Sequence, residues 1–377
     1  MDLNKKKILF LTGTRADFGK LKSLILELQL HPGFEVHIFV TGMHMLARYG
    51  YTCEEVERIG VKNIYKYINQ NANDSMDQIL AKTILGLSDY VREVHPDLIV
   101  VHGDRVEALA GATVGALNNI LTSHIEGGEV SGTIDELIRH AVTKLSHVHF
   151  VSNTAARQRL IQLGESGATV HVIGSPDVDV MNSSELPSLH DVRRHYLIEF
   201  ENYAVLAFHP VTTEIVNLRA QVRTFVDALI ESGHNYVVIY PNNDHGTEII
   251  IDEYSRIMNH PRFKVFPSMR FEYFLTLLRN ATFMIGNSSA GVREAPHFGV
   301  PSINLGSRQH NRVKSGLIVN SEINVNAISE AIIRALKIPR MPEALFGDGG
   351  SANHFKEILT KDFIWSQSKQ KHFIDMQ

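Results

Sequence analysis

Short apolar runs alternate along this chain with longer segments in which apolar residues recur at helical spacing. In the first half the pattern predicts strands at residues 8–12, 35–41, 98–102, 121–125 and 147–152. Helices are predicted between them at residues 20–29, 77–94, 105–118 and 133–145. The run Leu98-Ile99-Val100-Val101 has no polar alternation, which indicates a strand covered on both faces. Such an alternation of strands and helices predicts parallel sheets in an α/β protein.

The second half repeats this alternation after a polar interval. The periodicity lapses after Gly174-Ser175-Pro176, and strands are predicted again at residues 204–208, 236–240, 263–266, 282–285 and 302–305. We therefore expect two doubly wound, Rossmann-like domains that face each other across a cleft, at residues 1–181 and 203–352. Residues 182–202 are expected to link them, and the helical segment 353–377 to pack back on the first domain. In such sheets ligands bind beyond the carboxyl ends of the strands.

Composition narrows the class of protein further. The length of 377 residues suits two domains. The 37 basic and 41 acidic side chains nearly balance, which argues against nucleic acid or an anionic membrane as a partner. The single cysteine fits a reducing compartment. No apolar run approaches the ~20 residues of a membrane span, and Arg15 and Asp17 interrupt the first run too early for a signal peptide. We expect a cytoplasmic protein.

The segment that follows the first strand suits an anion. Residues 12–20 read Thr-Gly-Thr-Arg-Ala-Asp-Phe-Gly-Lys, and we expect backbone N–H groups to lie open there at the start of a helix. With Arg15 and Lys20 nearby, such a turn can hold a phosphate or a diphosphate. The segment matches neither G-x-G-x-x-G nor a P-loop, so no dinucleotide cofactor is expected. The alternative is a tight turn with solvated charges.

Acidic side chains follow two strands that we expect to be neighbours. Asp104 and Glu126 each come directly after a strand end, so their carboxylates would meet in one crevice. Burial of both raises the pKa of at least one, which provides an acid and a base near neutral pH. Asp135 and Arg139 share a helix face at i, i+4. Helix capping by Asp104 and simple helix pairing are the alternatives, but three converging carboxylates favour catalysis.

The predicted second domain offers a further polar site. His209 precedes a proline at a strand end, where the chain must turn, so it is not expected in the core. Ser288 and Ser289 are predicted to start a helix and to offer hydroxyl and N–H groups to an anion. Glu294 lies where a carboxylate could accept hydrogen bonds from ribose hydroxyls. A plain helix cap is the alternative.

The chain contains 20 histidines, which raises the question of a metal site. His147 and His149 share a strand face, and His140 is close in sequence. There is no H-E-x-x-H motif and no cysteine cluster, so we expect structural or solvated histidines and no metal.

Together these motifs resemble those of the UDP-N-acetylglucosamine 2-epimerase family, whose members have the two-domain GT-B fold. The resemblance covers nearly the whole chain, through Gly13-Thr14-Arg15, His102-Gly103-Asp104-Arg105, His209-Pro210, Gly286-Asn287-Ser288-Ser289 and Arg293-Glu294-Ala295. Two segments resemble the hydrolysing branch, which makes N-acetylmannosamine for bacterial sialic acid synthesis. They are Arg15-Ala16-Asp17, where the other branch has Arg-Pro-Glu, and Ile125-Glu126-Gly127-Gly128-Glu129, where it has Val-Glu-Ala-Gly-Leu-Arg.

The resemblance implies that UDP-N-acetylglucosamine and water are converted to UDP and N-acetylmannosamine, through elimination to 2-acetamidoglucal and then hydration. It implies no cofactor, no metal and a homodimer. It assigns the acid/base chemistry to Asp104, Glu126 and Asp135. Substrate or UDP binding falls to Arg15, Lys20, Arg105, Arg139, His209, Asn242, Phe274, Ser288, Ser289, Glu294 and Arg308.

Several alternatives stay open on the sequence. A non-hydrolysing epimerase would return intact UDP-N-acetylmannosamine, and a hydrolysing relative could act on UDP-2,4-diacetamido-trideoxyglucose or GDP-N-acetylglucosamine. A glycosyltransferase shares the fold but has no need of three convergent carboxylates. A sugar-nucleotide sensor would bind without turnover, and the same carboxylates argue against it.

Overall fold

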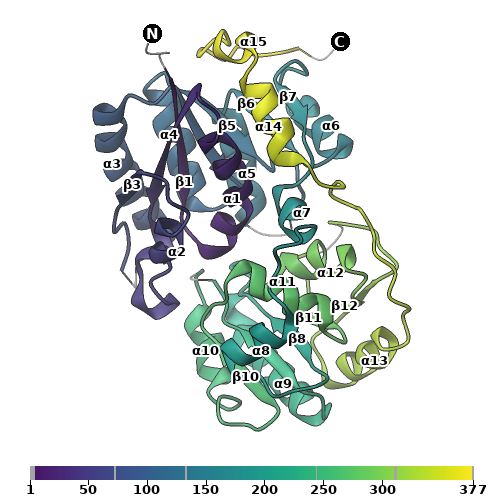
Figure 1. Ribbon diagram of the computed structural model, residues 1–377. Coiled ribbons are helices and arrows are strands. Elements are labelled where there is room, and N and C mark those ends of the chain that lie inside the picture. Colours follow the sequence, from purple (N-terminus) through teal and green to yellow (C-terminus); the bar gives the residue numbers. More distant parts are fainter. Residues whose placement is uncertain (1–4, 72–73, 132–133, 243, 310–311, 376–377) are drawn as a thin grey trace. The chain divides into compact units, whose positions relative to one another are not determined.

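The structure is a computed structural model that describes residues 5–71, 74–131, 134–242, 244–309 and 312–375. The chain divides into two units, and each is described by itself (Figure 1). Unit 1 comprises Met1–Glu129, Asp135–Asn182 and Phe346–Gln377. Unit 2 comprises Val130–Ile134 and Ser183–Leu345.

Unit 1 is built on a parallel sheet with the strand order β3-β2-β1-β4-β5-β6-β7. The strand order reverses between β1 and β4, which is the switch point where such sheets bind ligands. The strands of unit 1 are β1 (Lys6–Thr12), β2 (Phe34–Val40), β3 (Asn63–Lys66), β4 (Leu98–His102), β5 (Leu121–Ile125), β6 (Val148–Val151) and β7 (Val170–Val172).

Helices cover the sheet of unit 1, because their apolar residues recur at helical spacing and need a partner surface. Helices α1, α7 and α14 pack together, and Phe355 of α14 contacts Phe10 and Phe150 of the sheet, so the C-terminal segment lies on this unit. The helices are α1 (Arg15–Gln29), η1 (Gly42–Met45), η2 (Ala47–Tyr49), α2 (Cys53–Glu57), α3 (Met76–Val94), α4 (Val106–Leu117), α5 (Ile134–Leu145), α6 (Thr154–Gln162), α7 (Pro176–Met181), α14 (Ser351–Leu359) and α15 (Asp362–Trp365).

Unit 2 repeats the design, with the parallel order β10-β9-β8-β11-β12-β13 and a switch point between β8 and β11. Its strands are β8 (Ala204–Ala207), β9 (Tyr236–Ile239), β10 (Phe263–Phe266), β11 (Met284–Gly286), β12 (Ser302–Leu305) and β13 (Ile318–Ser321). Its helices are α8 (Leu189–Tyr196), α9 (Ile215–Glu231), α10 (Thr247–Tyr254), α11 (Phe271–Asn280), η3 (Ser289–Gly291), α12 (Glu294–His297) and α13 (Val325–Ala335).

The structure differs from the sequence-based expectations in strand number, unit boundaries and the start of one helix. Strands β3, β7 and β13, which have three or four residues each and form edges of the sheets, were not predicted. Of residues 182–202, expected as a linker, all but Asn182 belong to unit 2, because α8 buries Val192 and the segment after it buries Ile198 in that unit's core. Residues 346–352, expected in the second domain, belong to unit 1. Helix α1 begins at Arg15 rather than at Lys20.

The described helices include none that is long and apolar enough to cross a membrane.

Candidate active site

The turn between β1 and α1 is closed by its own side chains. Thr14 caps α1 and accepts a hydrogen bond from the N–H of Asp17 at 3.2 Å. The Asp17 carboxylate accepts the N–H groups of Gly13 and Thr14 at 3.0 and 3.1 Å, and the hydroxyl of Thr12 at 2.5 Å. This capping box uses N–H groups that the sequence analysis expected to be open to a phosphate. For the N–H groups of Gly13, Thr14 and Asp17 that expectation is wrong.

Arg15, the first residue of α1, lies against Glu55 of α2. Its Nε and Nη2 donate to the two carboxylate oxygens of Glu55 at 2.9 and 2.6 Å. Such a two-point pair fixes the plane of the guanidinium group. Arg15 is therefore held at the switch point of unit 1, with a carboxylate already bound to it.

The carboxylate of Glu126 lies in a buried polar cluster of unit 1. Its Oε2 is 3.3 Å from Nε2 of His102 and 3.7 Å from Nζ of Lys20, and the hydroxyl of Ser175 donates to Oε1. Lys20 also lies 3.2 Å from Oδ2 of Asp177, which is fully buried. The cluster is assembled from β4, β5, α1 and α7, which lie far apart in the sequence.

Two features of this cluster suit proton chemistry. A single ammonium group, that of Lys20, contacts the buried carboxyl groups of both Glu126 and Asp177. Two acidic side chains are therefore held around one cation. Glu126 also has a φ of +64°, a left-handed conformation that residues other than glycine seldom adopt and that is found most often at functional sites.

Asp104 lies at the end of the neighbouring strand, as predicted. Strands β4 and β5 pair directly, with His102 opposite Ile125, so the turns that follow them are adjacent. Arg139 of α5 donates from Nη2 to the Asp104 carboxylate and from Nη1 to the carbonyl of Glu129 at 3.1 Å.

Asp135 is placed on the same helix as this arginine. It is partly buried in the first turn of α5 and precedes Arg139 by four residues, so the two lie on one helix face. Thr133, the first residue of the helix predicted at residues 133–145, lies outside the described residues.

Arg105, which follows Asp104, contacts the carboxylate of Glu107, a residue that the sequence analysis did not identify. Its Nε lies 3.3 Å from Oε2 of Glu107, which is 2% exposed. A side chain at Gly13 would lie 2.9 Å from Cδ of Glu107, so glycine there makes room for the carboxylate. No spacing along the sequence indicates this contact, because residues 13 and 107 belong to different βα units.

In unit 2, His209 and Asn242 are brought together with Asn287 and Arg308 at the switch point. Asn287, 1% exposed, accepts the N–H of His209 at 2.7 Å and donates to its carbonyl at 2.8 Å. The backbone carbonyl of Asn287 accepts hydrogen bonds from Arg308 at 3.3 Å and Gln309 at 3.1 Å. Nδ1 of His209 accepts the N–H of Asn242 at 3.1 Å. Asn287 and Gln309 therefore support the predicted residues.

The serine segment begins a shorter helix than expected. Ser288 caps the 3₁₀ turn η3, which starts at Ser289 and spans three residues, and the four-residue helix α12 begins at buried Glu294. Neither is long enough for an appreciable helix dipole, so hydroxyl groups rather than the dipole are left to attract an anion. Phe274 of α11 is partly buried against the core of unit 2.

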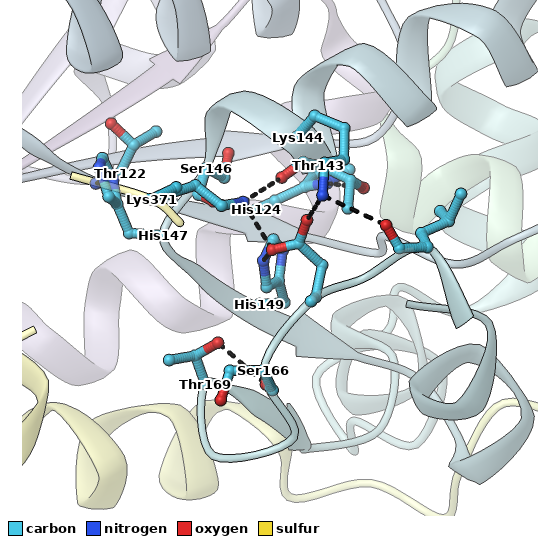
Figure 2. A network of polar contacts seen from close by, with 12 residues as sticks. Thr122, His124, Thr143, Lys144, Ser146, His147, His149, Ser166, Thr169 and Lys371 are labelled. Atoms are coloured by element: carbon cyan, nitrogen blue, oxygen red, sulfur yellow. Dashed lines mark hydrogen bonds and ion pairs between the residues drawn. The ribbon is translucent and has the colours of Figure 1, made fainter. Parts of the chain in front are cut away.

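The histidines considered for a metal have other partners. His147 accepts the N–H of Thr122 at 3.1 Å and contacts the carbonyl of Lys369 at 3.0 Å, whereas His149 contacts Glu165 at 3.0 Å (Figure 2). Within the described ranges no group of three or more His, Cys, Asp or Glu side chains has the arrangement of a metal site.

Two Rossmann-type parallel sheets, each with charged and hydroxyl-bearing residues at its switch point, define an α/β protein of the GT-B fold class. The chain belongs to the UDP-N-acetylglucosamine 2-epimerase family, which matches residues 26–360. The predicted family and fold class are therefore confirmed.

Individual relatives agree with this assignment. The chain is 48% identical over 375 residues to the UDP-N-acetylglucosamine 2-epimerase of Neisseria meningitidis serogroup B, with 98% of this chain and 99% of the relative covered. It is 32% identical to the UDP-N,N'-diacetylbacillosamine 2-epimerase (hydrolyzing) of Legionella pneumophila, with 97% and 98% covered. The fold matches a crystal structure of a Neisseria meningitidis UDP-GlcNAc 2-epimerase bound to UDP-GlcNAc, with a TM-score of 0.79, 20% identity and coverage of 94% and 99%.

Proposed function

We propose that this protein is a hydrolysing UDP-N-acetylglucosamine 2-epimerase, which converts UDP-N-acetylglucosamine and water to UDP and N-acetylmannosamine. The observation that carries the proposal is the pair of carboxylates, Asp104 and Glu126, on adjacent strand ends, each held by a basic side chain. The Neisseria relative supports the substrate, and the Legionella relative supports hydrolysis.

The chemistry needs an acid and a base but no adjacent carbonyl group. A base removes the proton from carbon 2 of the sugar while the bond from carbon 1 to the diphosphate oxygen breaks, which gives UDP and 2-acetamidoglucal. Water then adds its oxygen to carbon 1, and an acid delivers a proton to carbon 2 from the opposite face. We assign these proton transfers to Asp104, Glu126 and Asp135.

The nucleotide contacts are assigned to unit 2. Because Nδ1 of His209 accepts the N–H of Asn242, Nε2 carries the proton of a neutral ring and can donate to a diphosphate oxygen. Ser288, Ser289 and Arg308 supply further donors, and Glu294 accepts from the ribose.

The assignments in unit 1 differ in how well the contacts support them. Arg15 and Arg105 are assigned to the diphosphate and Arg139 to the substrate. The contacts of Lys20 with Glu126 and Asp177 favour a place in the acid/base cluster over UDP binding. We also propose a cytoplasmic homodimer that supplies N-acetylmannosamine for sialic acid synthesis.

The decisive test is incubation with UDP-N-acetylglucosamine in deuterated water, followed by NMR of the products. Free N-acetylmannosamine with deuterium at carbon 2, together with UDP, is the expected result. Intact UDP-N-acetylmannosamine would instead identify a non-hydrolysing epimerase. Product without solvent deuterium would refute the proton chemistry proposed here.

A matched set of amide variants tests the carboxylates. Asp104→Asn, Glu126→Gln and Asp135→Asn keep the shape of each side chain but remove its titratable group. Each is expected to lower turnover by about 10²–10⁴-fold, the usual contribution of a general acid or base. UDP affinity by calorimetry and the melting temperature should stay near wild type. Full activity in all three variants would place the chemistry elsewhere.

The Legionella relative favours a second candidate, in which the substrate is a UDP-2,4-diacetamido-trideoxy sugar. Turnover of both nucleotide sugars, and of GDP-N-acetylglucosamine, at equal concentrations separates these candidates. We expect the highest kcat/KM with UDP-N-acetylglucosamine.

A further inference from the structure

The imidazole ring of His124 lies fully buried beneath the turn that leads to Asp104. His124 is on β5, and its Nε2 lies 2.8 Å from the carbonyl oxygen of Gly103, which follows β4 directly and precedes Asp104. Its Nδ1 lies 3.1 Å from the hydroxyl of Thr143 on α5. Figure 2 shows His124 and Thr143 among the residues of the polar network that includes Lys144 and Lys371.

These two contacts define the state of the ring. A carbonyl oxygen can only accept, so Nε2 must carry the proton, and Nδ1 of a neutral ring then accepts from the Thr143 hydroxyl. Burial, reinforced by the neighbouring His149, lowers the pKa of His124 to about 3, although the bond to Gly103 opposes this. His124 is therefore neutral at physiological pH, and both ring nitrogens are engaged by protein groups. It is not placed to shuttle protons itself.

The turn that His124 contacts is held by polar bonds rather than by packing. Gly103 has a φ of +71°, and a side chain added there would meet nothing within 4 Å. Its N–H donates to the carbonyl of Ile125 at 3.0 Å, and its carbonyl accepts from His124 at 2.8 Å. Both polar atoms of the residue before Asp104 are thus fixed by β5.

We propose that His124 is a positioning residue for this enzyme: through the Gly103 carbonyl it fixes the turn that aims Asp104. The inference rests on the role proposed above for Asp104. A carboxylate displaced by about 1 Å can lose roughly 100-fold in rate, because proton transfer requires a closely defined approach.

The neighbouring strand supplies a matched control. His149 of β6 lies directly opposite His124 in the sheet and is as fully buried. Its Nε2 contacts Glu165 at 3.0 Å, whereas Nε2 of His124 contacts Gly103. Loss of this ring disturbs the same sheet without touching the turn.

The test compares two amides at residue 124. In His124→Gln the amide nitrogen reaches the former position of Nε2 and can still donate to Gly103, whereas in His124→Asn it ends near Nδ1 and cannot. We expect kcat for UDP-N-acetylglucosamine consumption to fall about 10–100-fold in His124→Asn and to stay within about 3-fold of wild type in His124→Gln. The KM and the UDP affinity should change little in either variant. His149→Asn should lower the melting temperature comparably and leave kcat within about 3-fold.

Hydrogen exchange measured by mass spectrometry on peptides covering residues 101–106 provides a readout that does not depend on activity. We expect faster exchange of the Gly103 amide in His124→Asn than in His124→Gln or wild type. Thr143→Val removes only the hydroxyl that orients the His124 ring. This variant tests the positioning role if His124→Asn fails to fold. An intermediate loss of kcat, about 3–10-fold, is expected there.

The outcomes separate the two proposals. Equal kcat in the Gln and Asn variants of His124, or equal losses in His124→Asn and His149→Asn, would overturn the positioning role. Unchanged kcat in Thr143→Val would do the same. A wild-type enzyme that consumes no UDP-N-acetylglucosamine would refute the proposed function. The exchange rates would then decide by themselves whether His124 holds the turn.

Discussion

Replacement of Glu165 by glutamine is expected to destabilise unit 1 in a pH-dependent way. The carboxylate of Glu165, 3% exposed, accepts hydrogen bonds from Lys144 at 2.7 Å and from Lys371 at 2.5 Å, and it contacts His149 at 3.0 Å (Figure 2). Lys371 also donates to the carbonyls of Thr143 and Ser146 at the end of α5. Glutamine keeps the shape of the side chain but faces two ammonium groups without a charge.

The magnitude follows from the pKa of this carboxyl group. Burial raises the pKa of Glu165, but the hydrogen bond from His149 and those from Lys144 and Lys371 outweigh burial and lower it from 4.5 to about 2. The gap between these values corresponds to about 3 kcal/mol of unfolding free energy. Because the pKa is lower in the folded state, this stabilisation is complete above pH 4.5 and is lost as the pH falls towards 2.

The assay is urea unfolding followed by the fluorescence of Trp365, the single tryptophan of the chain, in α15 of the same unit. At pH 7 we expect Glu165→Gln to be about 3 kcal/mol less stable than wild type. At pH 3.5 the difference should be about 1 kcal/mol smaller, because Glu165 binds a proton there in the unfolded wild-type chain but not in the folded one, which lowers the stability of the wild type alone. Glu93→Gln, at an exposed position of α3, is the matched control and should show no such change. A pH-independent difference, or none at pH 7, would refute the reasoning.

Three further variants test the two sites. Lys20→Met should lower kcat about 100-fold and leave the Kd for UDP within about 3-fold, because Lys20 contacts the acid/base cluster. A large loss of UDP affinity in calorimetry would instead assign Lys20 to nucleotide binding. Ser288→Ala combined with Ser289→Ala should weaken UDP binding by about 1–3 kcal/mol, and unchanged affinity would contradict the placement. Asn287→Ala removes two buried hydrogen bonds to the backbone of His209 and should lower the unfolding free energy of unit 2 by about 2–4 kcal/mol in urea. An unchanged unfolding free energy would show that these hydrogen bonds are dispensable.

The main architecture of both units was predictable because it is encoded in local patterns. The run of four apolar residues in β4 identified a strand covered on both faces, and the strand–helix alternation predicted parallel sheets. The short edge strands were missed because a three-residue run such as β7 shows no period. Helix α8 was missed because its mostly polar sequence buries only Val192.

The candidate site could be predicted only where strand ends mark it. Asp104 and Glu126 were identified because each follows a strand, and the pairing of β4 with β5 confirms that they lie at adjacent strand ends. The Thr14-x-x-Asp17 spacing is a capping signal in the sequence, and it explains why the N–H groups of that turn are occupied. Asp177 had no such signal, because its contact with Lys20 joins helices more than 150 residues apart.

At Glu126 the left-handed backbone conformation favours glycine for stability, whereas the proposed chemistry requires a carboxylate. An L-amino acid with a side chain is less stable in this conformation than glycine by about 1–2 kcal/mol. Glycine would also leave Lys20 and Asp177 as a balanced pair of opposite charges. A library selected for thermal stability alone would therefore drift towards glycine at position 126 and become inactive. Stabilised variants of this enzyme need a screen that reads turnover, since resistance to heat by itself rewards the loss of the carboxylate.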